Sequence, residues 1–379
     1  MFFHLDLDAF FISVERILDP QIIGKPVVVG GDPHGRGVVA ACSYEAREYG
    51  IYSGMPIRKA YQLCPHGIYL RGHYDEYVRY SNVVRRILEN KFPLVEQASI
   101  DEFYLDFTGC EGIYGHPYFY ASRIQGEIKR ELGLPCSIGI ASNKFVAKVA
   151  SDYAKPEGIT FVVPGREAEF LDPLPVEAMP GVGEVMKREL NDRGFYTIGQ
   201  IARTPKSYFQ MVFGKWGAVM HSHACGEGSN LISIHYEQKS ISRETTFQTD
   251  TTDFEFVEKT LLELVEDAGN ALRAENYMAG TISVKLRYSD FVTVTRAKTI
   301  SEVTDNDKVI FKVALNLLHK AWTRRVSIRL VGIHLSNFVI TTEQEKLFPS
   351  LEEKQRRVLR TIDRLKSKYG FEVIRFGVA

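Results

Sequence analysis

A proline-rich passage near the middle of the chain constrains the fold more than any other feature. Prolines follow Val163, Leu174 and Met179, and proline lacks the backbone N–H that helix interiors and central strands require. Before this passage short strands alternate with helices, though not as a strict βαβ repeat. After it, short helices extend to about residue 229, and a second mixture of strands and helices begins near residue 232. Because 379 residues are also too many for one ordinary core, we predict an α+β protein of roughly two to four domains.

The spacing of apolar residues predicts individual elements on both sides of this passage. Strands are predicted at residues 2–8, 26–30, 37–41, 98–107 and 136–141, and later at 280–288, 291–300 and 326–335. Helices are predicted at residues 9–18, 74–90, 124–132 and 143–154, the last capped by Ser142, and later at 255–274, 308–322 and 351–369.

The composition excludes several classes of protein. Hydrophobic residues make up 45% and charged residues 25% of the chain, as in folded proteins and unlike disordered or collagen-like ones. The 47 Lys and Arg equal the 47 Asp and Glu, so any basic surface for a nucleic acid must be local. No apolar stretch approaches the roughly 18 residues of a membrane span, and the first residues lack the basic region of a secretory signal. We expect a cytoplasmic protein without a membrane partner, and five cysteines without a CxxC pair indicate neither a disulfide framework nor a thiolate zinc site.

Four carboxylates near predicted strand ends carry the first chemical signal. Asp6 and Asp8 are two residues apart and share one strand face, whereas Asp101 and Glu102 are adjacent and serve one site only if the strand bends there. Converging carboxylates need cations, because their repulsion otherwise raises their pKa values. Hard oxygen ligands suit Mg²⁺, and two such ions are the recurrent device for in-line phosphoryl transfer. For either pair taken alone, solvated acids at strand ends are the simpler interpretation.

Five short motifs, in this order, resemble those of the Y-family (translesion) DNA polymerases, particularly their bacterial DNA polymerase IV branch. They are Asp6-Leu-Asp-Ala-Phe-Phe-Ile-Ser-Val-Glu, Ser43-Tyr-Glu-Ala-Arg, Gly50-Ile-Tyr-Ser-Gly-Met-Pro, Ser99-Ile-Asp-Glu and Ala154-Lys-Pro-Glu-Gly. The resemblance implies a right-hand polymerase with a palm (1–17 and 73–164), fingers (18–72), a helix–hairpin–helix thumb (165–230), an α+β little finger (231–341) and a tail (342–379). It implies error-prone, template-directed addition of deoxynucleotides in translesion synthesis, by a monomer that binds primer–template DNA.

The family's site roles transfer to matching positions. Asp6, Asp101 and Glu102 match the catalytic metal ligands, the Leu7 carbonyl completes the set for two Mg²⁺, and Asp8 is a support or a solvated acid. On the nucleotide side, Phe11 matches the steric gate beneath the sugar and Phe10 beside it fills core, while Tyr44, Arg47 and Lys155 match contacts to the triphosphate. Val38, Ala40 and Gly54 resemble the small residues that roof the nascent base pair.

Two regions resemble the family's DNA-binding elements. In Met179-Pro-Gly-Val-Gly-Glu, Gly181 and Gly183 allow a tight turn whose N–H groups contact a phosphate without reading sequence. In the last α+β part, four basic residues stand against one acid between residues 281 and 299. They form two pairs that each share a strand face, Lys285 with Arg287 and Arg296 with Lys298. A strand pair of this kind follows a phosphate backbone, or is simply an exposed sheet face kept soluble by charge.

Gln344-Glu-Lys-Leu-Phe is similar to the short motif by which bacterial replication proteins bind the sliding clamp. Gln344 opens the motif, and Leu347 and Phe348 would fill an apolar pocket on the clamp. Alternatively these two residues pack on the predicted tail helix.

Two other functions stay open on the sequence. A nucleotide cyclase uses a similar carboxylate palm, but it does not explain the helix–hairpin–helix or the basic strands. A non-catalytic DNA-binding accessory protein explains those elements, but the intact acidic trio argues against it.

Overall fold

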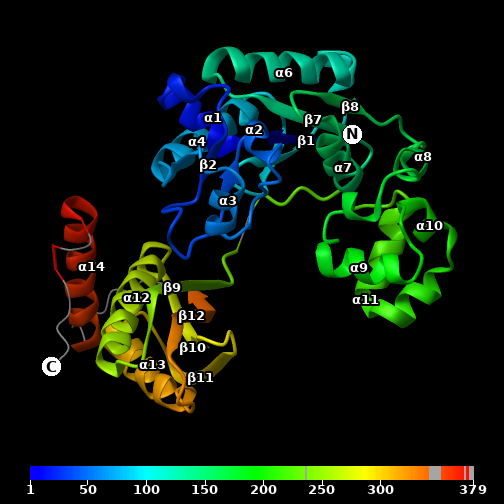
Figure 1. Ribbon diagram of the computed structural model, residues 1–379. Coiled ribbons are helices and arrows are strands. Elements are labelled where there is room, and N and C mark those ends of the chain that lie inside the picture. The colour runs from blue at the N-terminus through cyan, green and yellow to red at the C-terminus, as the bar shows by residue number, and fades with distance from the viewer. Residues whose placement is uncertain (235–236, 341–350, 371–372, 375–379) are drawn as a thin grey trace. The chain divides into compact units, whose positions relative to one another are not determined.

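The computed structural model describes residues 1–234, 237–340, 351–370 and 373–374. The chain forms two compact units, Met1–His235 and Tyr236–Ala379, each built around its own sheet (Figure 1). Among the described residues, no helix combines the length and the apolar character needed to span a membrane.

The main sheet of the first unit has the strand order β5-β6-β1-β7-β8. Its central strand is β1 (Phe2–Leu7), which is buried throughout and pairs antiparallel with both neighbours, β6 (Glu102–Asp106) and β7 (Cys136–Ala141). The edges are β5 (Leu94–Gln97) and β8 (Ile159–Phe161). A central strand buried on both faces is typical of a sheet that is covered by helices on both sides.

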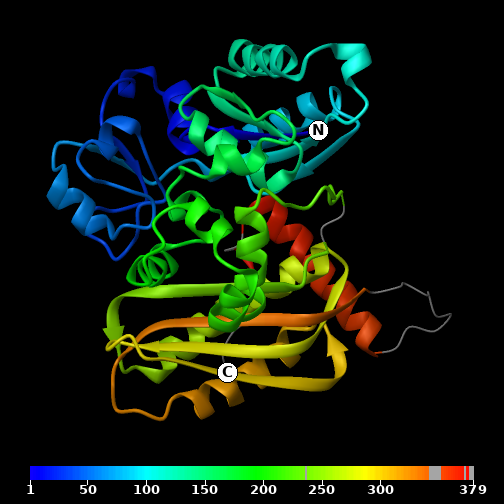
Figure 2. The same ribbon diagram turned by 90° about the vertical axis from the view of Figure 1, so that its right-hand side faces the viewer.

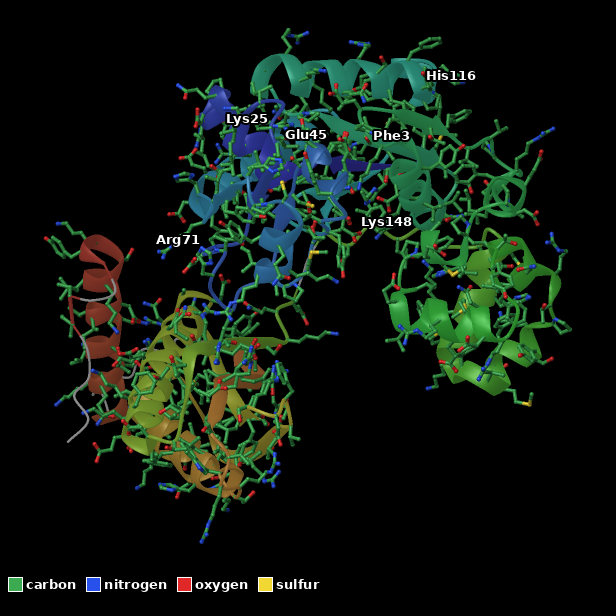
Figure 3. The ribbon with its side chains drawn as sticks, in the orientation of Figure 1. Phe3, Lys25, Glu45, Arg71, His116 and Lys148 are labelled. Atoms are coloured by element: carbon green, nitrogen blue, oxygen red, sulfur yellow. The ribbon has the colours of Figure 1, made fainter. Side chains whose placement is uncertain are left out.

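The two faces of this sheet carry different residues. Phe3, which Figure 3 labels on β1, lies on the face that forms a core with α1 (Phe10–Leu18), α4 (Tyr74–Glu89) and α6 (Pro117–Leu132). Residues of β1 alternate between faces, so His4 and Asp6 lie on the opposite face. There α7 (Lys144–Ala154) packs against the sheet through its apolar side.

Three predicted elements of this unit need correction. Of the predicted strand 98–107, Glu102–Asp106 (β6) is a strand, whereas residues 98–101 form the turn of a hairpin with β5, which ends at Gln97. The cap of α7 is Asn143, whose side chain accepts a hydrogen bond from Val146 N at 3.0 Å, and not Ser142. Of the predicted strand 37–41, only Ala41 lies in a regular strand, β3 (Ala41–Cys42).

A smaller sheet and short helices lie between α1 and α4. The sheet has the order β3-β2-β4, with β2 at Val27–Val29 and β4 at Ile68–Leu70. The helical elements are η1 (Pro20–Ile22), α2 (Tyr44–Arg47) and α3 (Ile57–Leu63), and the short α5 (Glu111–Tyr114) precedes α6.

The proline-rich passage opens a helical section, as predicted. Its elements are α8 (Glu167–Leu171), η2 (Val176–Ala178), α9 (Glu184–Asp192), α10 (Ile198–Arg203) and α11 (Lys206–Ala224). Their buried apolar side chains join those of α7 in one cluster, so this section and the sheet belong to the same unit.

The second unit is a four-stranded antiparallel sheet of order β11-β10-β12-β9. Its strands are β9 (Ser240–Thr251), β10 (Tyr277–Tyr288), β11 (Thr293–Thr304) and β12 (Ile328–Ile340), seen side by side in Figure 2. Two helices, α12 (Phe254–Ala274) and α13 (Asp307–Ala321), cover one face, and α14 (Leu351–Tyr369) packs beside them. Strand β9 was not predicted.

Candidate active site

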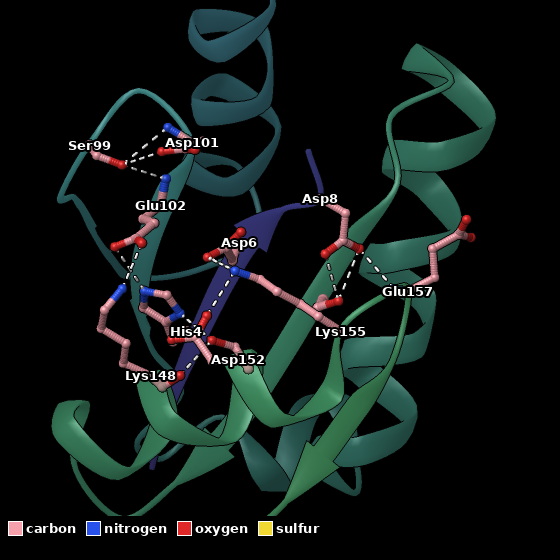
Figure 4. Close-up of polar contacts among 12 residues, drawn as sticks. His4, Asp6, Asp8, Ser99, Asp101, Glu102, Lys148, Asp152, Lys155 and Glu157 are labelled. Carbon is pink, nitrogen blue, oxygen red and sulfur yellow. Dashed lines mark hydrogen bonds and ion pairs between the residues drawn. The ribbon is translucent and has the colours of Figure 1, made fainter. Parts of the chain in front are cut away.

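The structure brings the three predicted catalytic acids together at the end of β1 (Figure 4). Asp6 on β1 lies directly opposite Glu102 on β6 in the antiparallel register. Leu7 N donates a hydrogen bond to Asp101 O at 3.0 Å, which fixes the preceding turn against the same strand end. Acids almost a hundred residues apart in the sequence therefore share one edge of the sheet.

A serine shapes the turn that carries Asp101. Ser99 Oγ accepts hydrogen bonds from the backbone N–H groups of Glu102 (3.0 Å) and Asp101 (3.3 Å), and it donates one to Asp101 Oδ1 at 2.5 Å. The predicted bend at the acids is therefore present, as a hairpin turn that a side chain stabilises locally.

One face of α7 and its C-terminal cap supply two lysines to these acids. Lys148 Nζ lies 2.6 Å from Glu102 Oε1, and Lys155 Nζ lies 2.7 Å from Asp6 Oδ2 and 2.8 Å from Asp152 Oδ1. Residues 148, 152 and 155 follow one another at spacings of four and three, so they share a side of the helix. Sequence reasoning identified only Lys155, although this spacing beside an acidic strand was a usable signal.

Burial and charge act in opposite directions on the two acids of the strand pair. Burial raises the pKa of Asp6 to about 7, although Lys155 acts to lower it. The pKa of Glu102 is instead lowered to about 2, by His4 and by Lys148, which together outweigh the effect of its partial burial. Burial lowers the pKa of Lys155, but Asp6 and Asp152 raise it more, so this side chain keeps its charge.

His4 lies beneath the acids and was missed by the sequence reasoning. Its Nδ1 atom is 2.7 Å from Ser151 Oγ, and its Nε2 atom is 3.6 Å from Glu102 Oε2 without a hydrogen bond. Burial lowers the pKa of this imidazole, while the neighbouring Glu102 carboxylate acts to raise it. The alternation of β1, which puts His4 on the same face as Asp6, was the available signal.

Asp8 supports the site and is not a solvated acid. It is 1% exposed, and its carboxylate accepts hydrogen bonds from Ser137 Oγ at 2.9 Å and from Glu157 N at 2.8 Å. Burial raises its pKa, while these hydrogen bonds act to lower it. Asp8 thus ties the end of β1 to β7 and to the loop after α7.

The donor set suits a hard cation. Asp6, Asp101, Glu102 and the Leu7 carbonyl offer only oxygen ligands, and two of the acids already attract lysine ammonium groups. Within the described part of the chain, no three His, Cys, Asp or Glu side chains are arranged to hold a metal ion as they stand. The chemistry of these residues therefore fits divalent ions. In the structure, the carboxylates of Asp6 and Glu102 point toward the lysines.

Apart from Lys155, which caps α7, the predicted nucleotide residues lie on α1 and α2. The Phe11 ring stacks on Tyr77 with centroids 4.2 Å apart and an interplanar angle of 11°, whereas Phe10 is buried in the core as predicted. The Arg47 guanidinium lies 4.8 Å from the centroid of the Tyr44 ring. Burial raises the pKa of Tyr44, and the charges of Asp8 and Asp6 add to this effect. The Tyr44 hydroxyl therefore lies within the electrostatic influence of the Asp6 and Asp8 carboxylates.

The predicted roof residues lie together but are not buried. Val39 is inside the core, so its neighbours Val38 and Ala40 point outward and are exposed. Gly54 N donates to Val39 O at 2.8 Å, which brings the exposed Gly54 beside them. These small residues thus form one exposed edge, whereas Val38 and Ala40 were predicted to lie in the strand 37–41.

Only one glycine of the predicted helix–hairpin–helix needs to be glycine. Gly181 has a φ of +93°, and a Cβ there would lie 2.7 Å from the Trp216 ring. Gly183 is the N-cap of α9 with a φ of −84°, which other residues adopt readily.

The four basic residues of β10 and β11 do not line a single face. Arg296 pairs in register with Val284 and Lys298 with Ile282, both of which are core residues. Lys285 and Arg287 alternate with these core residues on β10 and so lie on the opposite face of the sheet. Lys285 is paired there with Glu244 at 2.7 Å. The predicted clamp residues Gln344, Leu347 and Phe348 lie outside the described residues.

Comparison with known proteins matches most of the chain to one family. The sequence model of the impB/mucB/samB family matches residues 5–152, and that of the family's C-terminal domain matches residues 238–347. The chain is 39% identical over 375 residues to DNA polymerase IV of Dehalococcoides mccartyi (strain CBDB1), covering 99% of this chain and 96% of that protein. It is 41% identical over 336 residues to DNA polymerase IV of Methanoculleus marisnigri, covering 88% and 93%.

Solved structures show the same fold at 30% identity. The Y-family DNA polymerase chimera Dbh-Dpo4(243-245)-Dbh has a TM-score of 0.81, with 90% of this chain and 99% of that chain covered. The insertion ternary complex of Dbh DNA polymerase has a TM-score of 0.61 at the same coverage. These matches confirm the predicted multidomain polymerase fold and the translesion polymerase function, over the cyclase and the accessory protein. Across nearly its whole length the chain belongs to the Y family of DNA polymerases, as a homologue of DNA polymerase IV.

Proposed function

We propose that Asp6, Asp101 and Glu102, with the Leu7 carbonyl, hold two Mg²⁺ ions for the addition of a deoxynucleotide to a primer 3′ end. When bound, the ions lower the pKa of the primer hydroxyl and stabilise the pyrophosphate leaving group. The observation that carries this proposal is the register of β1 and β6, which sets Asp6 opposite Glu102 beside the Asp101 turn.

The lysines of α7 assist the acids in two ways. Lys148 forms an ion pair with Glu102, and this contact restricts the rotamers of the half-buried Glu102 carboxylate. Lys155 contacts Asp6 and Asp152 at the end of β1, where the resemblance expects the triphosphate. We expect Lys155 to neutralise phosphate charge there, together with Arg47 and the Tyr44 hydroxyl.

Selection of the nucleotide follows from the surfaces on each side of it. The Phe11 ring is fixed by its stack on Tyr77, so it forms a rigid floor against which a ribose 2′-hydroxyl would clash. The exposed edge of Val38, Ala40 and Gly54 forms a low roof that packs loosely on a base pair. A loose roof tolerates distorted template bases, because shape selection requires tight packing.

DNA contacts come from both units. The N–H groups of the turn at Gly181 position a backbone phosphate. In the second unit, Arg287 and Lys285 lie on the sheet face that α12 and α13 leave uncovered, and this face is our candidate for duplex contact.

The sliding clamp is a proposed partner for Gln344, Leu347 and Phe348. A clamp-binding measurement on the full-length variant Leu347→Ala/Phe348→Ala tests this assignment.

Primer extension by the purified chain tests the proposal. Asp101→Ala/Glu102→Ala should abolish extension in Mg²⁺ and weaken Mn²⁺ binding measured by electron paramagnetic resonance. Asp106→Asn is the matched control, because Asp106 ends the same strand and its carboxylate only accepts a hydrogen bond from Thr108 N. Extension by the double variant at the parent rate would refute the assignment of the acids.

A further inference from the structure

The C-terminal helix α14 lies beyond the region that the family's C-terminal domain matches, which ends at residue 347. Its inner side is attached to α12 by charged groups. Lys366 Nζ lies 2.6 Å from Glu266 Oε2, and both side chains are 3% exposed. Asp363 contacts Arg273 Nε at 2.6 Å and Arg273 Nη2 at 2.9 Å.

Further contacts on the same side fix the rotation of the helix. Arg273 also contacts Asp307 at 2.7 Å, so one guanidinium joins α12, α13 and α14. Arg356 lies 3.0 Å from Asp305 Oδ2, and Leu359 is buried. The loss of either partner of a buried ion pair leaves an uncompensated charge and strongly destabilises the fold. These pairs therefore fix which face of α14 points inward.

The outer side of α14 is therefore defined, and it is basic. Lys354, Arg357, Arg364 and Lys368 are all exposed, and Thr361 lies between them. Their spacings of three, four, three and four residues place them in one stripe along the helix. Within the described part of the chain, no acid pairs with any of these four cations. From residue 354 to residue 369 the sequence holds a single acid, Asp363, and it is turned inward.

The length and chemistry of this stripe fit a nucleic-acid backbone. Fourteen residues of helix span about 21 Å at about 1.5 Å per residue. Duplex DNA carries one phosphate charge per about 1.7 Å of its axis, so about twelve phosphates lie within that length. A membrane surface fits less well, because an interfacial helix needs a free apolar face, whereas in α14 Leu359 is buried and Ile362 and Leu365 are half-buried.

We propose that the outer stripe of α14 (Lys354, Arg357, Arg364 and Lys368) is an additional DNA-binding surface that contacts backbone phosphates without reading sequence. The proposal rests on DNA as the substrate of the family and not on the assignment of the metal ligands. It predicts added affinity that salt screens, and no effect on the chemical step.

The full-length variant Arg357→Gln/Arg364→Gln/Lys368→Gln tests the proposal against a matched control. The control Lys259→Gln/Lys312→Gln/Lys320→Gln removes the same charge from exposed positions on α12 and α13. The affinity for a fluorescent primer–template duplex is measured between 50 and 300 mM salt, and the logarithm of the binding constant is plotted against the logarithm of the salt concentration. Each phosphate contact contributes about 0.9 units to the slope of this plot. The stripe variant should lose up to about 2.7 units of slope, and the control less than about 0.5.

Further measurements separate this proposal from its alternatives. The extension rate at saturating DNA should stay at the parent value in both variants, and thermal melting should show that both are folded. An unchanged slope, or an equal loss in the control, would overturn the proposal. Binding of the parent to anionic phospholipid vesicles that the stripe variant loses, with the DNA slope unchanged, would overturn it in favour of a membrane surface.

Discussion

Ser99 gives the sharpest test of how the turn positions the catalytic acids. The hydroxyl makes three hydrogen bonds, to Asp101 Oδ1 at 2.5 Å and to the N–H groups of Glu102 and Asp101 at 3.0 and 3.3 Å. In Ser99→Ala the turn should persist, because Ala98 N still donates to Glu102 O at 3.0 Å and the β5–β6 ladder remains. The Asp101 side chain, in contrast, loses the group that orients it.

The magnitude follows from that one lost contact. A hydrogen bond to a charged group is worth about 1.5–3 kcal/mol, and Ser99 is exposed, so water replaces part of it. About 1.5–2 kcal/mol of lost orientation corresponds to about a 10- to 30-fold lower rate of nucleotide addition. Supporting residues around metal ligands commonly change metal affinity or activity by about 10- to 100-fold, so this value lies in the expected range.

The assay is single-turnover addition of one nucleotide at saturating deoxynucleotide and Mg²⁺, with Mn²⁺ binding as an independent readout. Ser99→Thr is the control, because it keeps the hydroxyl and should stay within about threefold of the parent. If Ser99→Ala also adds nucleotides within threefold of the parent rate, the turn does not position Asp101 and our account of the site is wrong.

Four further predictions test separate parts of the structure. Phe11→Ala should reduce discrimination against ribonucleotides by about 30- to 150-fold, equivalent to about 2–3 kcal/mol, and unchanged incorporation ratios would exclude a steric gate. Arg47→Ala should raise the KM of the deoxynucleotide by about tenfold or more while the Kd of DNA stays within threefold, and the reverse pattern would place it on the DNA. Arg287→Gln should reduce the slope of log affinity against log salt concentration for DNA binding by about 0.9 units. Arg296→Gln should leave this slope unchanged, because the two arginines lie on opposite faces of the sheet, and equal effects of the two variants would contradict this. Lys366→Met should destabilise the second unit by about 3–5 kcal/mol, and an unchanged calorimetric transition would show that the buried pair does not hold α14.

The fold was predictable where one apolar pattern matched one element. The predicted strand 136–141 and the predicted helix 351–369 agree with β7 and α14 at both ends. Strand β9 was missed because its sequence is largely polar, with Ile241 and Phe247 as its buried apolar residues. The turn at residues 98–101 was taken as strand because Ala98 and Ile100 alternate with polar residues, although they are out of phase with the buried Phe103 and Leu105 of β6. This break in the alternation marks the turn that the hydrogen bonds of Ser99 stabilise.

The acids of the site were predictable and their surroundings were not. Asp6, Asp101 and Glu102 lie within recognisable motifs, and the pairing of β1 with β6 brings them together. The contacts of Lys148 and His4 depend on how closely α7 approaches the sheet, and a local pattern does not encode that distance. The side of the sheet on which each basic residue of β10 and β11 falls likewise depends on register, which a single strand sequence leaves open.

A glycine explains how α7 reaches the acids. Gly139 on β7 pairs in register with His4, and a Cβ at this position would collide with the backbone of Ala147 and Ser151. The missing side chain lets α7 pack directly on the sheet, so that Ser151 reaches the His4 ring and the cations of the helix reach the strand end. The same helix places Val146, Val149 and Ala150 in the core. The packing of α7 and the charge balance of the acids are therefore one structural property, and a larger residue at position 139 would disturb both at once.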